Sequence, residues 1–150
     1  MAIARGAGTE IIRSGLFEDV TNVAQPLIVG IQHHIYTILS ITAFCRQGND
    51  TAGRLEIYLV GFDALGATSG ATLNIIREVT PKEDEVFVWN DKFSFNGYEP
   101  TGVSSAMNTG TEQDAIADQG GSVAQTLYLK SNTASNIYDV TITYIDQNNA

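Results

Sequence analysis

Basic residues are scarce in this sequence, and the shortage limits which partners it can bind. Eight Lys and Arg residues stand against 17 Asp and Glu residues, which gives a formal net charge of −9 at pH 7. A net-negative surface repels phosphate backbones, so the composition argues against a nucleic-acid partner. We expect the acidic surface to serve solubility first. An alternative is that it points away from a negatively charged neighbour.

Cysteine is scarce and long apolar runs are absent. Cys45 is the single cysteine, so no disulfide can form within the chain. It lies in an apolar run, where a small buried side chain is expected and a nucleophile is not. No run approaches the ~20 apolar residues of a membrane span, and residues 1–6 lack the apolar region of a signal peptide. We therefore expect folding in a cytoplasm and no membrane partner.

Sequence patterns of known catalytic and cofactor sites do not occur. The Gly-x-Ser-x-Gly, Cys-x-x-Cys, His-Glu-x-x-His and phosphate-loop patterns are all absent. His33 and His34 would point to opposite faces of a strand, which does not suit one metal ion. Glu112, Asp114 and Asp118 lack the glycine and final glutamate of a calcium loop, so a solvated acidic loop is preferred. We predict no enzyme activity, no catalytic residue, no metal and no cofactor.

What the sequence has instead is a series of β-strand patterns. Residues 34–45 are uncharged and apolar at both alternating sets of positions, which predicts a strand central in a sheet. Residues 54–61 alternate next, and we predict that they pair with 34–45 as a hairpin. Residues 123–130 and 137–145 predict a closing hairpin. Other strands are expected at 9–14, 26–30, 71–79, 85–89 and 92–98.

Two outward-facing positions of the last strand are polar, and so are most of the residues after it. Thr141 and Thr143 alternate with the apolar side chains of that strand, which indicates a solvated or contact surface. Residues 146–150 are expected to form a polar tail. The stretch 99–122 shows no periodicity, and loops of this length in a small domain are usually functional or ordered by partners.

The first 25 residues differ from the rest. Residues 15–24 suit either an amphipathic helix or an extended arm. Ordering about twenty residues costs roughly 20–40 kcal/mol, whereas burying their apolar side chains returns about 9–18 kcal/mol. We hypothesise an N-terminal arm (1–25) that docks on a neighbouring subunit, followed by a β-sandwich domain (26–150). The alternative is a first strand of the same domain. The contact residues of the arm would be Arg5, Ile11, Ile12, Arg13, Leu16 and Phe17.

Aromatic side chains concentrate in residues 87–98. Trp89, Phe93 and Tyr98 are candidates for a contact platform that stacks on a sugar or a base. Packing in the core or at an interface is the preferred interpretation, because Phe87 and Trp89 share one face of their strand. A carbohydrate-binding module would combine this platform with the stretch 99–122.

Three stretches carry a resemblance to a known family. They are Arg-Gly-x-Gly-Thr-Glu-Ile-Ile-Arg-Ser at 5–14, the apolar run at 27–40, and the ending at 136–146. Together they resemble small virion structural proteins of tailed bacteriophages, especially head decoration (cement) proteins. The resemblance implies an all-β fold, an antiparallel, jelly-roll-like β-sandwich with an N-terminal arm. It also implies a homo-oligomer, commonly a homotrimer.

The same resemblance implies a function and a location. We expect a capsid decoration protein that binds the major capsid protein on the virion surface, after synthesis in the host cytoplasm, and that bridges and stabilises capsomers. Two alternatives remain open. One is a tail, tail-fibre or baseplate subunit with the same fold, and the other is the carbohydrate-binding β-sandwich module.

Overall fold

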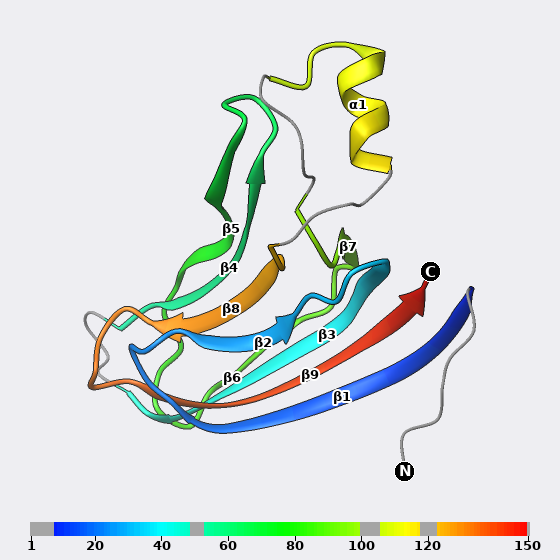
Figure 1. Ribbon diagram of the computed structural model, residues 1–150. Coiled ribbons are helices and arrows are strands. Elements are labelled where there is room, and N and C mark those ends of the chain that lie inside the picture. Colours follow the sequence, from blue (N-terminus) through cyan, green and yellow to red (C-terminus); the bar gives the residue numbers. More distant parts are fainter. Residues whose placement is uncertain (1–7, 49–52, 100–105, 118–122, 150) are drawn as a thin grey trace.

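Two antiparallel sheets stack face to face in the computed structural model, which describes residues 8–48, 53–99, 106–117 and 123–149 (Figure 1). Sheet A has the strand order β1-β9-β3-β6, with β7 also paired to β3, and sheet B has the order β2-β8-β4-β5. A short helix, α1, lies outside the two layers. The elements are β1 (Thr9–Val20), β2 (Gln25–Val29), β3 (His34–Gln47), β4 (Leu55–Asp63), β5 (Thr68–Val79), β6 (Val86–Trp89), β7 (Phe93–Asn96), α1 (Gly110–Ala117), β8 (Thr126–Ser131) and β9 (Ile137–Asn148).

The strand order follows from folding one long antiparallel ribbon. β1 pairs with β9, β2 with β8, β3 with β6 and β7, and β4 with β5, so the pairs are nested along the chain. The pairings β3–β9 and β4–β8 then close this ribbon into two layers. Nested pairs closed in this way form a jelly roll. The expected all-β, jelly-roll-like sandwich is confirmed.

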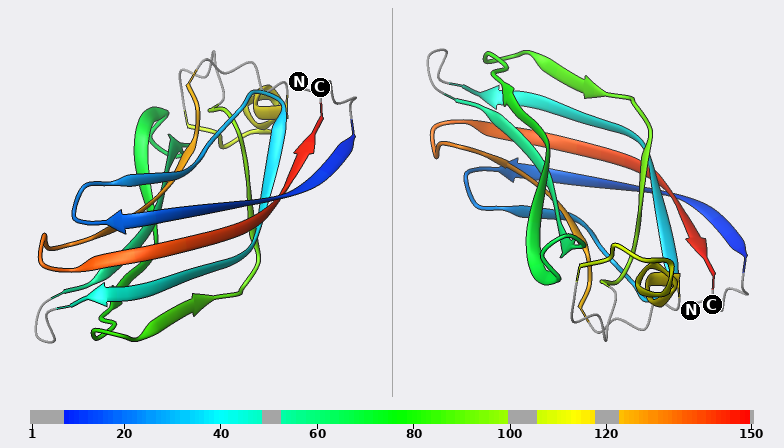
Figure 2. Two further views of the ribbon diagram at one scale, coloured as in Figure 1. Left: turned by 90° about the horizontal axis from the view of Figure 1, so that it is seen from below. Right: turned by 90° about the horizontal axis from the view of Figure 1, so that it is seen from above.

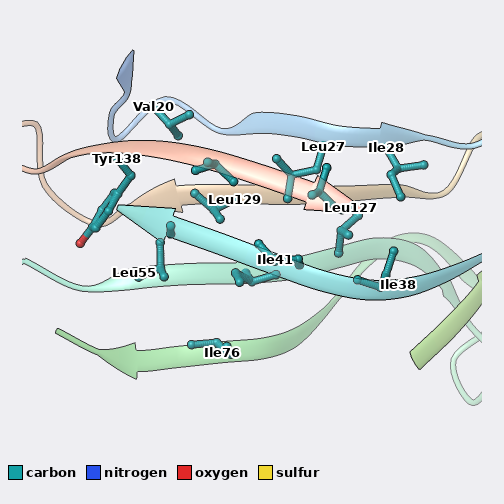
Figure 3. Packing of buried hydrophobic residues seen from close by; sticks show 14 of the residues in the cluster. Val20, Leu27, Ile28, Ile38, Ile41, Leu55, Ile76, Leu127, Leu129 and Tyr138 are labelled. Atoms are coloured by element: carbon teal, nitrogen blue, oxygen red, sulfur yellow. The ribbon is translucent and has the colours of Figure 1, made fainter. Parts of the chain in front are cut away.

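The core lies between the layers and is built from alternate residues of each strand (Figure 3). The predicted central position of residues 34–45 is confirmed, because β3 lies between β9 and the consecutive strands β6 and β7. Ile38 and Ile41 of β3 are completely buried and face Leu127 and Leu129 of β8 across the core. Each such side chain contributes about 1.5–3 kcal/mol on burial, which holds the two sheets together.

Both predicted hairpins are wrong. β3 and β4 follow each other in sequence but lie in different sheets, and so do β8 and β9. The strands are where the sequence predicts them, but β3 pairs with β9 and β4 pairs with β8, and neither pairs with the next strand along the chain as predicted. In a jelly roll consecutive strands cover each other's apolar face across the core, and their backbone hydrogen bonds go to strands far away in sequence. Among the strands that the structure describes, β4 and β5 alone form a local hairpin, at the tip of the ribbon.

Residues 9–20 of the predicted arm are part of the sandwich and do not form a separate arm. Thr9–Val20 forms β1, the edge strand of sheet A, which pairs along its length with β9 from Thr9↔Asn148 to Val20↔Tyr138. A register shift between Phe17 and Val20 lets Val20 reach the core. The backbone pairing that the entropy argument required is thus supplied by the same chain. The alternative of a first strand is what the structure shows, and docking on a neighbouring subunit stays a prediction.

The stretch 99–122 contains regular structure that the sequence analysis did not predict. Gly110–Ala117 forms α1, and Thr109 caps it. The backbone N–H of Glu112 donates to Oγ1 of Thr109 at 3.3 Å, while Oε2 of Glu112 accepts from the backbone N–H of Thr109 at 2.9 Å. This reciprocal pair is a capping box, and its Thr-x-x-Glu signature is present in the sequence.

Two glycines allow the backbone of the β2–β3 connection to touch the end of β7. The backbone N–H of Gly30 donates to the carbonyl of Gln125 at 2.9 Å, and the N–H of Gln125 donates to the carbonyl of Gly97 at 2.8 Å. A Cβ on Gly30 would overlap the Gly97 carbonyl, and a Cβ on Gly97 would overlap the Ile31 carbonyl. This close approach therefore requires glycine at both positions.

The substitution Gly30→Ala should lower the free energy of unfolding by about 1–3 kcal/mol, because the backbones must separate to admit the methyl group. Urea denaturation monitored by circular dichroism measures the change. Gly110→Ala is the matched control, since a Cβ there meets nothing within 4 Å. Equal loss in both variants would contradict the close-approach explanation.

Candidate functional site

The outward side of sheet A is a broad surface without charged side chains at its centre. Figure 2 (left) looks onto this side, and no helix or strand of the described chain covers it. Register and burial place alternate residues of β1, β9, β3, β6 and β7 on it. We call this surface the outer face of sheet A, and it consists of Ile12, Ser14, Leu16, Ile35, Thr37, Ser40, Thr42, Phe44, Val86, Val88, Ser94, Thr141, Thr143 and Ile145.

The outer face combines exposed aliphatic groups with hydroxyl groups that bond to each other. Ile12 is 70% exposed and Leu16 is 66% exposed. Oγ of Ser14 lies 3.3 Å from Oγ1 of Thr143, across the β1–β9 pair. A second hydroxyl pair joins Thr37 of β3 to Ser94 of β7 at 2.9 Å. Because these hydroxyl groups have partners already, removing them from water costs less than burying free polar groups.

Charges begin only at the two ends of the outer face. Glu10 lies in the register row of Ile35 at one end, and Asp139 lies in the row of Phe44 at the other. Asp139 is 3.9 Å from the Arg46 guanidinium, so its charge is partly compensated. The three rows between these ends hold aliphatic and hydroxyl side chains alone. The placement of Thr141 and Thr143 on a solvated or contact surface agrees with this arrangement.

The proposed arm residues are divided between the two sides of sheet A. Ile12 and Leu16 point outward, opposite Ile145 and Thr141. The neighbouring arm residues face inward, where Phe17 packs against the core and Arg13 forms an ion pair. The remaining inward residue, Ile11, pairs with Asp146. Arg5 lies outside the described residues. The structure therefore joins two of the six predicted contact residues in one exposed surface.

The aromatic residues of the predicted platform do not form an exposed surface. Trp89 and Phe93 are on the inward side of sheet A, opposite Ile41 and Ile38, and pack against the core. Their rings meet edge to face with centroids 6.5 Å apart. Tyr98 lies apart, half-buried, where it bridges to Ala124. For Trp89 and Phe93, the structure agrees with the preferred interpretation, which was packing in the core.

Behind the outer face, one end of the sandwich holds a buried carboxylate. The side chain of Asp146 is 2% exposed, and its Oδ2 accepts from Nε of Arg13 at 2.8 Å. Its Oδ1 lies 2.6 Å from Nδ1 of His34. Since Arg13, Asp146 and His34 belong to β1, β9 and β3, this cluster ties three adjacent strands together. A buried carboxylate is tolerated only with such partners.

Tyr36 closes the same end of the core. Its hydroxyl oxygen accepts a hydrogen bond from the backbone N–H of Ile31 at 2.9 Å. Its ring contacts those of His34, Phe95 and Tyr144. Burial is the main reason why the pKa of Tyr36 is raised from 10.0 to about 12. A cavity of about 210 Å³ lies beside this ring and the Asp146 cluster.

The other candidate residues do not assemble into a reactive or metal site. Cys45 is buried, with its Sγ 3.4 Å from the Gln47 carbonyl. Glu112 caps α1, the side chain of Asp114 is not described, and Asp118 lies outside the described residues. Within the described ranges, no three His, Cys, Asp or Glu side chains gather as metal ligands. None of the helices described there is long and apolar enough to cross a membrane.

Sequence reasoning missed Asp146, which was expected to begin a polar tail. β9 continues to Asn148, and Asp146 is buried. The signal was the period of two, because Tyr138, Val140, Ile142 and Tyr144 all point inward and the next inward position is 146. A polar residue on the core side of a strand pattern indicates a paired buried charge.

Removing the charge of the buried carboxylate should destabilise the sandwich. Asp146→Asn leaves the Arg13 and His34 side chains without their anionic acceptor, so we expect a loss of about 1–3 kcal/mol in the free energy of unfolding. Chemical denaturation at neutral pH measures it. Asp91→Asn, at an exposed position, is the matched control and should change nothing. A neutral effect of Asp146→Asn would contradict the anchoring role.

High pH should destabilise the protein through Tyr36. Its folded-state pKa is raised, so the folded state holds the phenol proton more tightly than the unfolded state does. The stabilising effect is complete below the unfolded pKa of about 10 and is lost as the pH rises through about 12. Burial also raises the pKa of Tyr58, Tyr138 and Tyr144, so absorbance at 295 nm should show a group of late-titrating tyrosines, and Tyr36→Phe should reduce that group by one. Titration of all tyrosines near pH 10 before unfolding would contradict this.

Comparison with known proteins finds no family for this chain. No protein-family model matches the sequence, and no curated protein is similar to it. A chain from Bacillus endospore appendages, described as a novel family of disulfide-linked pili, is 10% identical over 100% of this chain and 97% of that one, with a TM-score of 0.41. A chain from the structure of maize chlorotic mottle virus is 13% identical over 94% of each, with a TM-score of 0.33. The strand order of this chain itself identifies it as a jelly roll.

Proposed function

We propose that this chain is a structural protein of a phage virion, a capsid decoration protein that binds the outside of the shell and stabilises it. The observation that carries this proposal is the outer face of sheet A. It exposes Ile12, Leu16, Val86 and Val88, each more than half exposed, on one side of a chain with a net charge of −9. Ile12 and Leu16 lie on β1 at one edge of the sheet and Val86 and Val88 on β6 at the other, with hydroxyl side chains of β9 and β3 between them. A sheet face that exposes apolar groups at both edges and carries no charge between them suits protein association.

The composition of the outer face suits association better than solubility alone. A strand surface kept only for solvent would carry Lys, Glu or other charged groups, as edge strands and exposed sheet faces commonly do. Here the central rows are aliphatic or hydroxyl-bearing, and the hydroxyl pairs Ser14–Thr143 and Thr37–Ser94 are already bonded. Covering the surface would release apolar area from water, and these four hydroxyl groups would keep their hydrogen bonds.

A decoration protein of this kind stabilises the shell by binding to it and does not need to catalyse a reaction. It binds the assembled shell and not the free capsid subunits, so its binding free energy adds to the stability of the shell. Contacts with two neighbouring capsomers at once strengthen each other through effective concentration. The acidic remainder of the chain faces solvent in this arrangement. The resemblance to cement proteins supports the capsid as partner and a homotrimer as assembly.

A tail or baseplate subunit could have the same fold. Its location in the particle would distinguish it from a decoration protein. Purified protein added to heads assembled without it should saturate at a fixed number of copies and raise the temperature at which the heads rupture. Differential scanning fluorimetry and electron microscopy of the decorated heads measure both effects. Failure to bind heads, with density for the chain in the tail, would overturn the decoration role.

Leu16→Asp should weaken binding to heads by at least about tenfold, because a charge would be buried where an aliphatic group was. Leu65→Asp is the matched control, since Leu65 is 77% exposed but lies at the turn between β4 and β5. Binding assays with heads at constant ionic strength compare the two. Equal affinity of both variants would show that the outer face takes no part.

A further inference from the structure

We propose that the outward side of sheet B holds a binding site for an acidic sugar, namely a uronic acid unit of a polysaccharide. This side of the sandwich is the one away from the outer face of sheet A, and the inference does not depend on the proposed function. A pocket of about 280 Å³ marks the site, just below the usual range of about 300–1,000 Å³ for drug-sized ligands. The pocket is lined by Glu56, Tyr58, Thr72, Asn74, Arg77 and Lys130.

The register of the strands brings these residues together from β8, β4 and β5. Tyr58 of β4 lies opposite Tyr128 of β8 on one side and opposite Asn74 of β5 on the other. Glu56 lies two residues before Tyr58, in the same row as Lys130 of β8. Since the alternate residues of β4 are buried in the core, these side chains share the outward side of the sheet.

One side of the Tyr58 ring is available to a ligand. The other side stacks on the Tyr128 ring, with the ring centroids 5.4 Å apart and the planes 20° apart. Because β8 and β5 lie on opposite sides of β4, this stack leaves the second side of the Tyr58 ring turned toward β5, whose Thr72 and Asn74 line the pocket. A pyranose ring packs its C–H groups on an aromatic face and directs its hydroxyl groups to polar partners around it.

The polar groups around this ring are free to bind a ligand. Within the described chain, no hydrogen bond or ion pair holds the side chains of Thr72, Asn74 or Arg77. The carboxylate of Glu56 has cationic neighbours at 3.7 Å and 3.8 Å, which is longer than a hydrogen bond. Sugar hydroxyl groups both donate and accept, so they match an amide beside a carboxylate.

The charge of the pocket favours an acidic sugar over a neutral one. Arg77 and Lys130 line the pocket against one carboxylate, that of Glu56, whereas the whole chain carries a net charge of −9. Glu78, which follows Arg77 in the sequence, does not line the pocket. A guanidinium binds a carboxylate through two parallel hydrogen bonds. Nζ of Lys130 lies 5.9 Å from the centre of the Tyr58 ring, so a second cation stands beside the stacking surface.

The sugar site stays accessible when the outer face of sheet A is covered. The two sheets enclose the core between them, so their outward sides face away from each other (Figure 1). A chain bound to the shell through sheet A would therefore turn the sugar site toward the surrounding medium. Particles that carry many copies would then adhere to acidic polysaccharides, because many weak sites act together.

Isothermal titration calorimetry of the full chain, without heads, tests the inference. The probes are oligosaccharides of galacturonate, of mannuronate, and of alternating glucuronate and N-acetylglucosamine. The wild type should bind at least one of them with a dissociation constant of the order of millimolar or below. It should bind the neutral oligosaccharide of N-acetylglucosamine at least about tenfold more weakly, because that ligand lacks the carboxylate. In nuclear magnetic resonance spectra, the amide signals of Tyr58, Asn74 and Arg77 should shift on binding.

Arg77→Gln should weaken binding of the acidic oligosaccharide by at least about tenfold, because the carboxylate loses its paired hydrogen bonds. Lys92→Gln is the matched control, since it removes the same charge at an exposed position between β6 and β7 and should bind like the wild type. Circular dichroism shows whether each variant is folded. If Arg77→Gln does not fold, Asn74→Ala, at an exposed position of β5, replaces it.

Four results would overturn the sugar site. They are no binding of any of the three acidic oligosaccharides, equal binding of the neutral one, binding of inorganic sulfate as tight as that of the sugar, and equal affinity of Arg77→Gln and Lys92→Gln. Equal binding of sulfate would show a site for anions in general. None of these measurements uses heads, so their failure leaves the decoration role as it stands, and a failure to bind heads leaves the sugar site as it stands.

Discussion

β9 pairs with both β1 and β3, and these two ladders hold sheet A together. They join the start, the middle and the end of the chain, from Thr9↔Asn148 on one side to His34↔Asn148 on the other. Without β9, sheet A would separate into an isolated β1 and the β3 group, and the core residues of β3 would lose their neighbours. Nearly all the architecture therefore depends on contacts between residues far apart in sequence, which is typical of β-sandwiches.

The two sides of sheet A show how one strand pattern serves two purposes. The inward positions of β9 give the core Val140 and Ile142, both completely buried. Its outward positions, Thr141 and Thr143, belong to the outer face, where β-branched hydroxyl residues keep a high β propensity without adding charge. The surface proposed for association is thus a consequence of the same alternation that builds the core. The net charge is carried elsewhere, at the ends of the strands and in the turns.

A buried polar cluster around Asp146 lies at one end of the sandwich, behind the outer face of sheet A. Where the apolar core ends, Asp146 binds Arg13 of β1 and contacts His34 of β3. These contacts specify one register for the edge strand, since a slip by one residue would turn Arg13 outward and leave a buried carboxylate without its cation. Fixing β1 also fixes Ile12 and Leu16, which lie on the opposite side of the same strand. The buried cluster therefore determines the shape of the proposed contact surface.

Most of the strands, the all-β class and the central place of residues 34–45 can be read from the sequence, because alternation and β propensity are local properties of the chain. The capping box of Thr109 and Glu112 is an equally local signal. The pairing of strands is not local: β3 and β4, like β8 and β9, lie in different sheets, since an alternating strand can pair with any other strand that covers its apolar side. For the same reason, the division of Ile12 and Leu16 from Arg13 and Phe17 became visible only when β9 was known to be the partner of β1.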